Sequence, residues 1–305
     1  MKVRVGTRGS LLATTQTAQT MATLQAAHPD LEVETVLIRT TGDIRQDVPL
    51  AEVGGDGLFV KELERALAEG RIDLAVHSLK DLPTAQPEGL ELAAILPRED
   101  ARDAFISAEG TSLESLPDGA RIGTGSSRRQ AQLAIMGRSW QVRGLRGNVD
   151  TRLARLQEGA FEAILLACAG LDRLDRGAVI TERLPFLKML PAPGQGAVVI
   201  QCRGEDAALR ARLAAVDDAE TRAAVTAERA LLACLHGGCS IPLGALGRVR
   251  SDRLELEAFL GLPDGSDHVR MSWTGPLAKP VDLGEALAER LIDAGGKAIL
   301  DRLRR

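Results

Sequence analysis

The sequence predicts an α/β protein with two lobes, joined by a hinge that the chain crosses twice, and a small α+β domain at its C-terminal end. Three observations lead to this fold class. Short apolar runs alternate with helical patterns in two successive sets. A segment that combines Pro or Gly with charge follows each set. The last third, in a chain of 305 residues, has three strand-like segments and a closing helix.

The first set predicts a sheet covered by helices. Ser10 can cap the first helix, which stops at His28 before a proline, and Gly70 can end the second helix. In chain order, the expected elements are a strand at 2–6, a helix at 11–27, a strand at 31–38, a helix at 58–70, and strands at 72–78 and 90–96.

The second set predicts another sheet of the same kind, with Asn148 as a possible helix cap. The strand expected at 197–202 follows the second crossing and suits a return to the first sheet. The remaining expected elements are strands at 103–107, 120–125, 141–144 and 162–170, helices at 127–136, 149–159 and 219–235, strands at 242–250, 253–262 and 268–275, and a closing helix from about 283 to 303.

These patterns set the expected domain boundaries. The first lobe comprises residues 1–97 with 197–216, and the second lobe comprises 102–191. The third domain comprises 218–305. Crossing segments rich in Pro, Gly and charge lie between them.

Composition argues against two classes of function. Aromatic residues make up 2% of the chain, tyrosine is absent, and the formal net charge is −4. Because nucleic-acid binding needs aromatic stacking faces or a basic surface, we expect no nucleic-acid partner. The sequence shows no apolar leader and no run long enough to cross a bilayer, so we expect a cytoplasmic protein without a membrane partner.

Cys239 lies in an unusual turn, LHGGCSIPLG at residues 235–244. Two glycines precede the sulfur and Pro242 follows it, which reduces bulk and restricts the backbone. Such a thiol is either a buried apolar side chain or an attachment point on a loop, and the turn alone leaves both open. We expect no metal site, because the spacing of Cys234, His236 and Cys239 fits no common zinc motif.

Polar and cationic residues follow strands at four places, where sites in open α/β sheets usually lie. A helix that begins there offers free N–H groups, and arginine can bind a carboxylate or phosphate through two hydrogen bonds. The four segments are GTRGS with Arg8 and Ser10, VHSLKD with Ser78, Lys80 and Asp81, GTGSSRRQ with Thr124, Ser126, Arg128 and Arg129, and RGLRGNVDTR with Arg143, Arg146 and Arg152.

A single arginine of this kind is most often a solvated surface charge. Several arginines at strand ends of two lobes indicate instead a site for a polyanionic ligand. Asp81 is a carboxylate among these cationic groups. It either forms a structural ion pair with Lys80 or a nearby arginine, or it handles protons and stabilises a transient positive charge.

Several motifs together resemble those of a known family. The segments ERALLACLHGGCSIPLG (228–244), VHSLKD, SSRRQAQL, LRGNVDTRL and PAPGQGA are similar to motifs of porphobilinogen deaminase, also called hydroxymethylbilane synthase. The motifs occur in the family's order, from about Val3 to the closing helix. The resemblance implies a monomer of three domains, the first two like hinged periplasmic binding proteins.

The resemblance also implies a reaction. A transferase of this family joins four porphobilinogen molecules head to tail with loss of four ammonias, and it releases the linear tetrapyrrole hydroxymethylbilane when water adds. Cys239 would carry a covalent dipyrromethane cofactor as a thioether. That cofactor is built from substrate and serves as the primer for the growing chain.

Roles for individual residues follow from the same match. Asp81 matches the catalytic aspartate, which would stabilise the azafulvene-like cation left when ammonia departs. Phe59 matches a position near the substrate rings and Gln195 one at the hinge. The positions implied to bind cofactor and substrate, mainly through their carboxylates, are Arg8, Ser10, Ser78, Lys80, Thr124, Ser126, Arg128, Arg129, Arg146, Arg152 and Arg173.

Four residues depart from the family pattern. Glu52 and Asp56 are acidic where lysines are common, on a loop over the cleft, and Gly125 and Ser127 stand where serine and leucine are expected. The main alternative function is a two-lobed protein that binds a small anion without reaction. The third domain and the Gly-Gly-Cys turn argue against that alternative.

Overall fold

The computed structural model describes residues 1–39, 60–235 and 241–304. They form two compact units, one of residues 1–99 and 197–222 and the other of residues 100–196 and 223–305. The chain therefore leaves the first unit, returns to it and leaves it again. The expectation that the segment after the second crossing rejoins the first sheet is confirmed.

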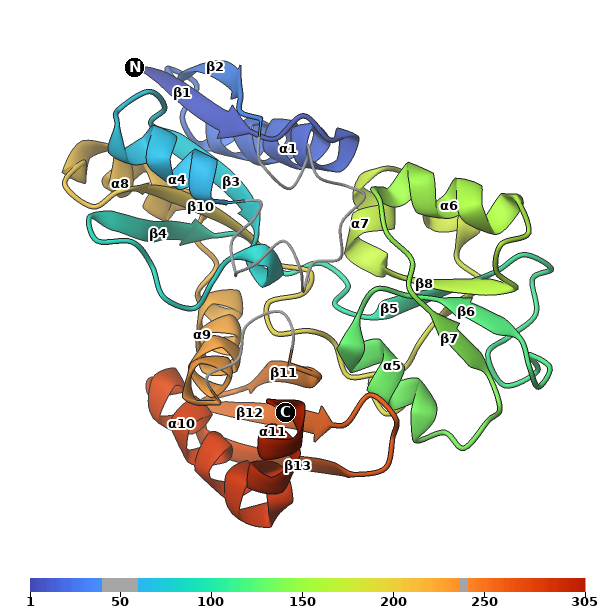
Figure 1. Cartoon of the computed structure of the whole chain (residues 1–305). Helices are drawn as coiled ribbons and strands as arrows, with labels where there is room; N and C mark the ends of the chain where they lie inside the picture. The colour runs from blue at the N-terminus through green and yellow to red at the C-terminus, as the bar shows by residue number, and fades with distance from the viewer. Residues whose placement is uncertain (40–59, 236–240, 305) are drawn as a thin grey trace. The chain divides into compact units, whose positions relative to one another are not determined.

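The first unit contains a five-stranded sheet in the order β2-β1-β3-β10-β4, with β1 parallel to both its neighbours and β10 antiparallel to both of its own (Figure 1). Helices α1 and α8 pack on one face and α4 packs on the other. The elements are β1 (Lys2–Thr7), α1 (Leu11–Ala27), β2 (Glu32–Leu37), α4 (Lys61–Ala68), β3 (Leu74–Ser78), the 3-10 helix η1 (Leu79–Asp81), β4 (Leu90–Ile95), β10 (Val198–Arg203), α8 (Ala207–Leu213) and the 3-10 helix η3 (Ala214–Val216).

The second unit contains a sheet of matching design, in the order β7-β6-β8-β5-β9. Strand β6 is parallel to β7 and β8, and β5 is antiparallel to β8 and β9. Its elements are β5 (Asp103–Ser107), β6 (Arg121–Gly123), α5 (Ser127–Ala134), β7 (Gln141–Arg143), α6 (Val149–Gln157), β8 (Ala163–Ala167), α7 (Cys168–Arg173), the 3-10 helix η2 (Gly177–Val179) and β9 (Glu182–Arg183).

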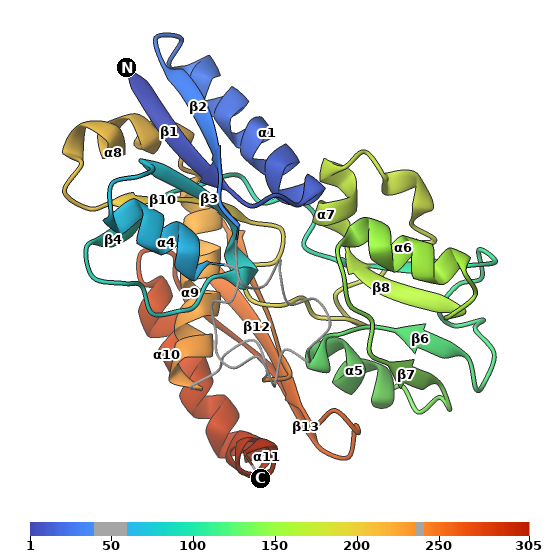
Figure 2. The same ribbon diagram turned by 45° about the horizontal axis from the view of Figure 1, so that its top comes forward.

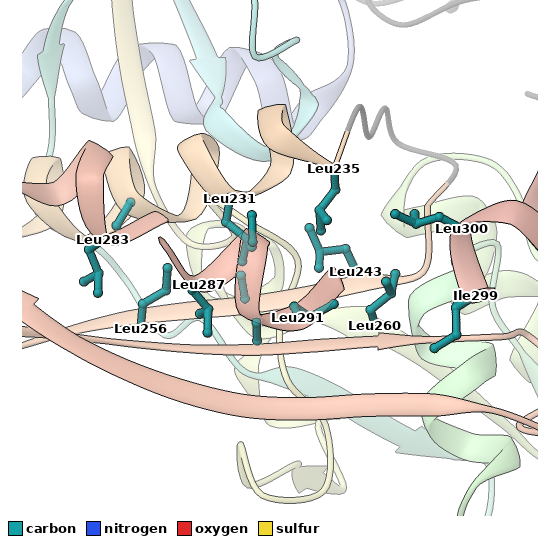
Figure 3. Packing of buried hydrophobic residues seen from close by; sticks show 14 of the residues in the cluster. Leu231, Leu235, Leu243, Leu256, Leu260, Leu283, Leu287, Leu291, Ile299 and Leu300 are labelled. Atoms are coloured by element: carbon teal, nitrogen blue, oxygen red, sulfur yellow. The ribbon is translucent and has the colours of Figure 1, made fainter. Parts of the chain in front are cut away.

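The rest of the second unit is a three-stranded antiparallel sheet, β11-β12-β13, with helices on one face (Figure 2). Figure 3 shows the leucines of α9, α10 and the strands that interlock there. The elements are α9 (Ala219–Cys234), β11 (Leu243–Arg250), β12 (Arg253–Gly261), β13 (His268–Pro276), α10 (Pro280–Leu291), the π turn η4 (Ile292–Gly296) and α11 (Lys297–Leu303).

One prediction about the closing helix is wrong. The sequence suggested one helix to about residue 303, but the structure has two helices with a π turn between them. Gly295 has a φ of 114°, which lies outside helical geometry and which a residue with a side chain rarely adopts. The chain therefore bends where glycine permits it.

The three-stranded sheet is joined to the lobe of its own unit through its other face. Leu246 and Phe259 pack there with Ala131 of α5 and Leu190. The fully buried Glu228 of α9 accepts hydrogen bonds from Gly194 N (2.6 Å) and Gly247 N (2.7 Å). The predicted fold class is thus confirmed, whereas the three separate domain boundaries remain a prediction.

Candidate active site

In the first unit, the predicted residues lie at the carboxyl edge of the sheet. Arg8 follows β1 and is half-buried, and Ser10 caps α1 by accepting a hydrogen bond from Ala13 N (3.3 Å). The cap was predicted from the serine before an apolar helical pattern, and it is confirmed. The edge therefore presents a helix N-terminus beside a cation.

Ser78 ends β3 at the same edge, and Lys80 and Asp81 lie in the 3-10 helix η1 directly after it. Ser78 Oγ donates a hydrogen bond to Gln16 Oε1 in the second turn of α1 (3.0 Å), which joins the end of β3 to that helix. Leu79 is buried and anchors the turn through its N–H to Ala197 O (3.0 Å). The backbone that carries the neighbouring residues is thereby fixed at this point of the turn.

Asp81 is half-buried and forms no ion pair with any residue that the structure describes. The structural ion pair with Lys80 that the sequence left open is therefore not present. A carboxylate that no cation among the described residues neutralises keeps its charge available for a positive ligand, and partial burial strengthens that attraction.

His77 is a buried polar residue of this edge that the sequence left without a role. Its Nε2 lies 3.2 Å from Gln201 Oε1, and Gln201 Nε2 donates to Gln86 Oε1 (3.0 Å). Burial is the main reason that the pKa of His77 falls to about 4, and the nearby positive charge of Arg8 adds to the shift. The imidazole is therefore neutral at neutral pH.

In the second unit, the segment between β6 and α5 forms the corresponding edge. Thr124 is buried, and its Oγ1 accepts a hydrogen bond from Ser126 N (3.2 Å). Ser126 caps α5 by accepting from Arg129 N (3.4 Å). A Cβ at Gly125 would lie 2.9 Å from Leu145 O, which gives a physical reason for glycine at this departure from the family pattern.

Arg128 and Arg129 are buried, and both bind the fully buried carboxylate of Asp103. Arg128 Nη1 donates to Asp103 Oδ2 (2.7 Å), and Arg129 Nη2 donates to Asp103 Oδ1 (2.7 Å). Each guanidinium also donates to a backbone carbonyl, of Leu190 (2.6 Å) and Leu165 (2.8 Å) respectively. The two guanidiniums hold the pKa of Asp103 far below its usual range.

This buried cluster of Asp103, Arg128 and Arg129 has two features of an anion site. Two guanidinium charges face one carboxylate, so one positive charge stays without an opposite charge inside the cluster. The Nε atoms of both arginines are buried and have no hydrogen-bond partner among the described residues. An unpaired buried donor costs about 1–3 kcal/mol, which a bound carboxylate would recover.

The other predicted residues of this unit differ in exposure. Arg146 is exposed, and the half-buried Arg152 donates from Nε to Gly147 O (2.7 Å). Arg173 is buried and donates from Nη2 to Gly196 O (2.8 Å). Gln195 is buried and donates from Nε2 to Ala101 O and to Asp103 Oδ1, both at 2.8 Å.

Several predicted residues lie outside the described part of the chain. These are Phe59 and Cys239, together with Glu52, Asp56 and His236. Asp103, in contrast, is described but was not predicted as part of a site. It begins a strand in the ARDAF segment, and only the antiparallel pairing of β5 with β8 brings it to the edge where the arginines lie.

Two further properties concern the described residues alone. None of their helices is long and apolar enough to cross a membrane. Within the ranges 1–39, 60–235 and 241–304, no three histidine, cysteine or acidic side chains are grouped so that they could hold a metal ion.

Comparisons with known proteins agree with the motifs. Residues 3–231 match the family model described as porphobilinogen deaminase, dipyromethane cofactor binding domain. Residues 222–293 match the model described as porphobilinogen deaminase, C-terminal domain. Among solved structures, the chain is similar to the periplasmic VFT2 domain of BvgS from Bordetella pertussis, at 15% identity and a TM-score of 0.42 over 70% of this chain and 85% of that one.

Curated relatives are much more similar. The chain is 46% identical over 301 residues to a porphobilinogen deaminase of Syntrophus aciditrophicus, which covers 99% of this chain and 98% of the relative. It is 50% identical over 303 residues to that of Desulforudis audaxviator, with 99% and 98% covered. It is also 50% identical over 300 residues to that of Trichlorobacter lovleyi, with 98% and 96% covered. The chain therefore belongs to the porphobilinogen deaminase family, a family of transferases.

Proposed function

We propose that this chain joins four porphobilinogen molecules into hydroxymethylbilane on a dipyrromethane primer that is attached to Cys239. The observation that carries the proposal is the buried pair of arginines whose charge exceeds that of Asp103 and whose Nε donors lack described partners. Each pyrrole unit brings an acetate and a propionate, so primer and growing chain present many carboxylates. Carboxylates fit both the excess charge and the unpaired donors.

The dipyrromethane group supplies a covalently held pyrrole end to which substrate is added. In each addition, the C–N bond of the substrate's aminomethyl group breaks and ammonia leaves. A C–C bond would form between that methylene carbon and the free ring carbon of the chain end, which would then lose a proton. After four additions, hydrolysis would break the C–C bond between the primer and the first added unit, with the hydroxyl of water going to the product and its proton to the freed ring carbon of the primer.

Asp81 stabilises the positive charge that develops as ammonia leaves. Its carboxylate is half-buried and makes no ion pair with the described residues, so its charge remains available to the electron-poor ring. Its place on a 3-10 turn fixed by the buried Leu79 keeps the carboxylate oriented without reorganisation during the reaction.

The other predicted positions hold the carboxylates and the rings. Ser10 and Ser126 cap helix N-termini, which favour anions. Phe59, which lies outside the described residues, is proposed to contact the rings, and Gln195 to act at the hinge. The proposed carboxylate-binding residues are Arg8, Ser10, Ser78, Lys80, Thr124, Ser126, Arg128, Arg129, Arg146, Arg152 and Arg173.

The experiment that tests the proposal is an intact-mass measurement on the purified chain and on two cysteine variants. The wild-type chain should exceed its sequence mass by one dipyrromethane, and Cys239→Ser should have the bare sequence mass. Cys234→Ser is the matched control, since Cys234 is an unbridged thiol five residues earlier, and it should keep the added mass. A wild-type chain without added mass, or an increment that persists in Cys239→Ser, would reject attachment at Cys239.

We also propose that the enzyme acts as a cytoplasmic monomer without a nucleic-acid or membrane partner. Light scattering should give the mass of a single chain, 32.4 kDa plus the primer. A dimer mass at micromolar concentration would reject this part of the proposal.

A further inference from the structure

We propose that Asp103 is a positioning residue for this reaction, holding Arg128 and Arg129 in the orientation in which their excess positive charge acts on the substrate carboxylates. We propose further that Asp103 ties this arginine pair, through Gln195, to the segment by which the chain returns to the first unit. The inference rests on the proposed function and adds a residue that acts on substrate only through others.

The two carboxylate oxygens of Asp103 bind different arginines. One oxygen accepts from Arg128 and the other from Arg129, each over 2.7 Å. Each guanidinium also donates to a backbone carbonyl, so neither guanidinium can rotate freely. What remains unpaired on both side chains is the Nε atom. A single carboxylate thus fixes the orientation of both guanidiniums.

The same carboxylate contacts the return segment. Gln195 Nε2 donates to Asp103 Oδ1 and to Ala101 O, both over 2.8 Å, and it belongs to the residues just before the second crossing. Gly194 and Gly196 on either side have φ values of 73° and 87°, which favour glycine. Arg173 binds the carbonyl of Gly196 over 2.8 Å. A buried network therefore joins the arginine pair to both chain segments at the crossing.

A second carboxylate with two arginines serves as a matched control. Asp73 binds Arg4 Nη2 (2.8 Å) and Arg203 Nη2 (2.9 Å) within the first unit. It precedes β3, whereas Ser78 ends that strand, so Asp73 lies at the opposite edge of the sheet from the predicted site residues. It has the same partner types but no expected role in substrate binding.

The test compares Asp103→Asn, Asp103→Glu and Asp73→Asn as full-length chains. Intact mass first gives the fraction of each chain that carries the primer, and steady-state kinetics on the loaded chains then separates KM from kcat. Asp103→Asn should carry less primer and, where loaded, should raise KM for porphobilinogen at least tenfold while kcat changes less than threefold. Asp103→Glu should lie between it and wild type, and Asp73→Asn should keep both primer and KM within twofold.

The outcomes are distinguishable from failure of the proposed function. A wild-type chain without primer rejects the proposed function itself. If the wild type is loaded, an Asp103→Asn chain with normal loading and a KM within twofold of wild type overturns the inference. An equal rise of KM in Asp73→Asn also overturns the inference, because it would show that loss of a partly buried ion pair elsewhere in the chain raises KM as much.

A further variant covers the case in which Asp103→Asn does not fold. Gln195→Met leaves the three charges in place and removes the amide that donates to Asp103 Oδ1 and to Ala101 O. It should raise KM at least threefold with the primer still attached. An unchanged KM in this variant overturns the inference by itself.

Discussion

Strand β10 of the first unit and strand β5 of the second occupy the same place in two sheets of the same design. Each is the first strand after a crossing, and each runs antiparallel between a parallel central strand and an edge strand. In both sheets, a serine after the first parallel strand caps the next helix by accepting from the residue three positions on. The scaffold at the two carboxyl edges is therefore equivalent.

The chemistry at the two edges differs. The second and third helix positions after the capping serine are Leu12 and Ala13 in the first unit, but Arg128 and Arg129 in the second. In the second unit they face Asp103, whose place in the ladder is taken in the first unit by Val198. The two edges thus differ in residue type at three matched positions. The first edge has an apolar helix start, and the second has a buried cluster with excess positive charge.

The difference separates the proposed roles of the two units. In the proposed function, the second edge would bind substrate carboxylates through arginine charges that a buried partner, Asp103, holds in place. The first edge carries Asp81, a carboxylate without an ion pair among the described residues, on a short turn. We therefore propose binding as the role of the second edge and charge stabilisation as the role of the first.

The largest expected effect comes from Asp81→Asn, which removes the charge of the first edge. We expect kcat to fall at least a hundredfold, or about 3 kcal/mol in barrier, while preloaded primer stays attached. The melting temperature should barely change, because no ion pair with described residues is lost. Rate measurements on preloaded enzyme test this, and a kcat within about threefold of wild type would show that the first edge supplies no essential charge.

A smaller effect on catalysis is expected from Arg128→Lys and Arg129→Lys at the second edge. Lysine keeps the charge but lacks Nε and the fork that reaches both Asp103 and a backbone carbonyl. We expect a higher KM for porphobilinogen, less primer, and a loss of a few kcal/mol in unfolding free energy, since a buried ion pair is disturbed.

Arg4→Lys is the control for these lysine variants. Arg4 pairs with Asp73 at a partly exposed position, so the change should have little effect on stability. Its KM should remain that of wild type. If the lysine variants of the second edge also retained wild-type KM and primer, the difference between the two edges would have no bearing on substrate binding.

The smallest expected effect is a pH dependence confined to the first sheet. Burial lowers the pKa of His77 to about 4 from an ordinary value of 6.5, so the unfolded chain binds more protons between these values. His77 therefore contributes stability that is present above pH 6.5 and is lost as pH falls toward 4, by up to about 3 kcal/mol. Burial raises the pKa of Glu64, which acts in the opposite sense.

Unfolding of wild type and His77→Gln across this pH range measures that contribution. The corresponding position of the second sheet is Leu166, which does not titrate. The wild type should lose more stability than the variant between pH 6.5 and 4. Parallel stability curves would show that His77 is protonated in the folded state as easily as in the unfolded one.

Local signals were sufficient for much of the fold. The caps at Ser10 and Asn148 were predicted from residue type next to a helical pattern, and each side chain accepts a hydrogen bond from a backbone N–H of the first helical turn. The return of the 197–202 segment followed from an apolar run after a crossing. The two-residue strand β9 and the break at Gly295 were missed, because one is too short for a pattern and the other depends on one backbone angle.

The candidate site was predicted less completely. Sequence motifs identified the arginines, the serines and Asp81, and family membership confirms the transferase function. Asp103 was not identified, because its partners are 25 and 26 positions away and meet it only through the strand order. The hydrogen bonds of Arg128 and Arg129 to this carboxylate likewise depend on tertiary packing and could not be predicted from the sequence. Roles of individual residues therefore remain predictions.

Primer-dependent chain growth can be tested by adding limiting porphobilinogen to the loaded enzyme, quenching the reaction, and locating the added mass on individual peptides. We expect discrete species that carry successive pyrrole units, all on the peptide that contains Cys239. In Arg128→Lys and Arg129→Lys the longer species should be depleted, because carboxylates of the growing chain lose their contacts. Added units on any other peptide, or turnover without enzyme-bound units, would contradict the account.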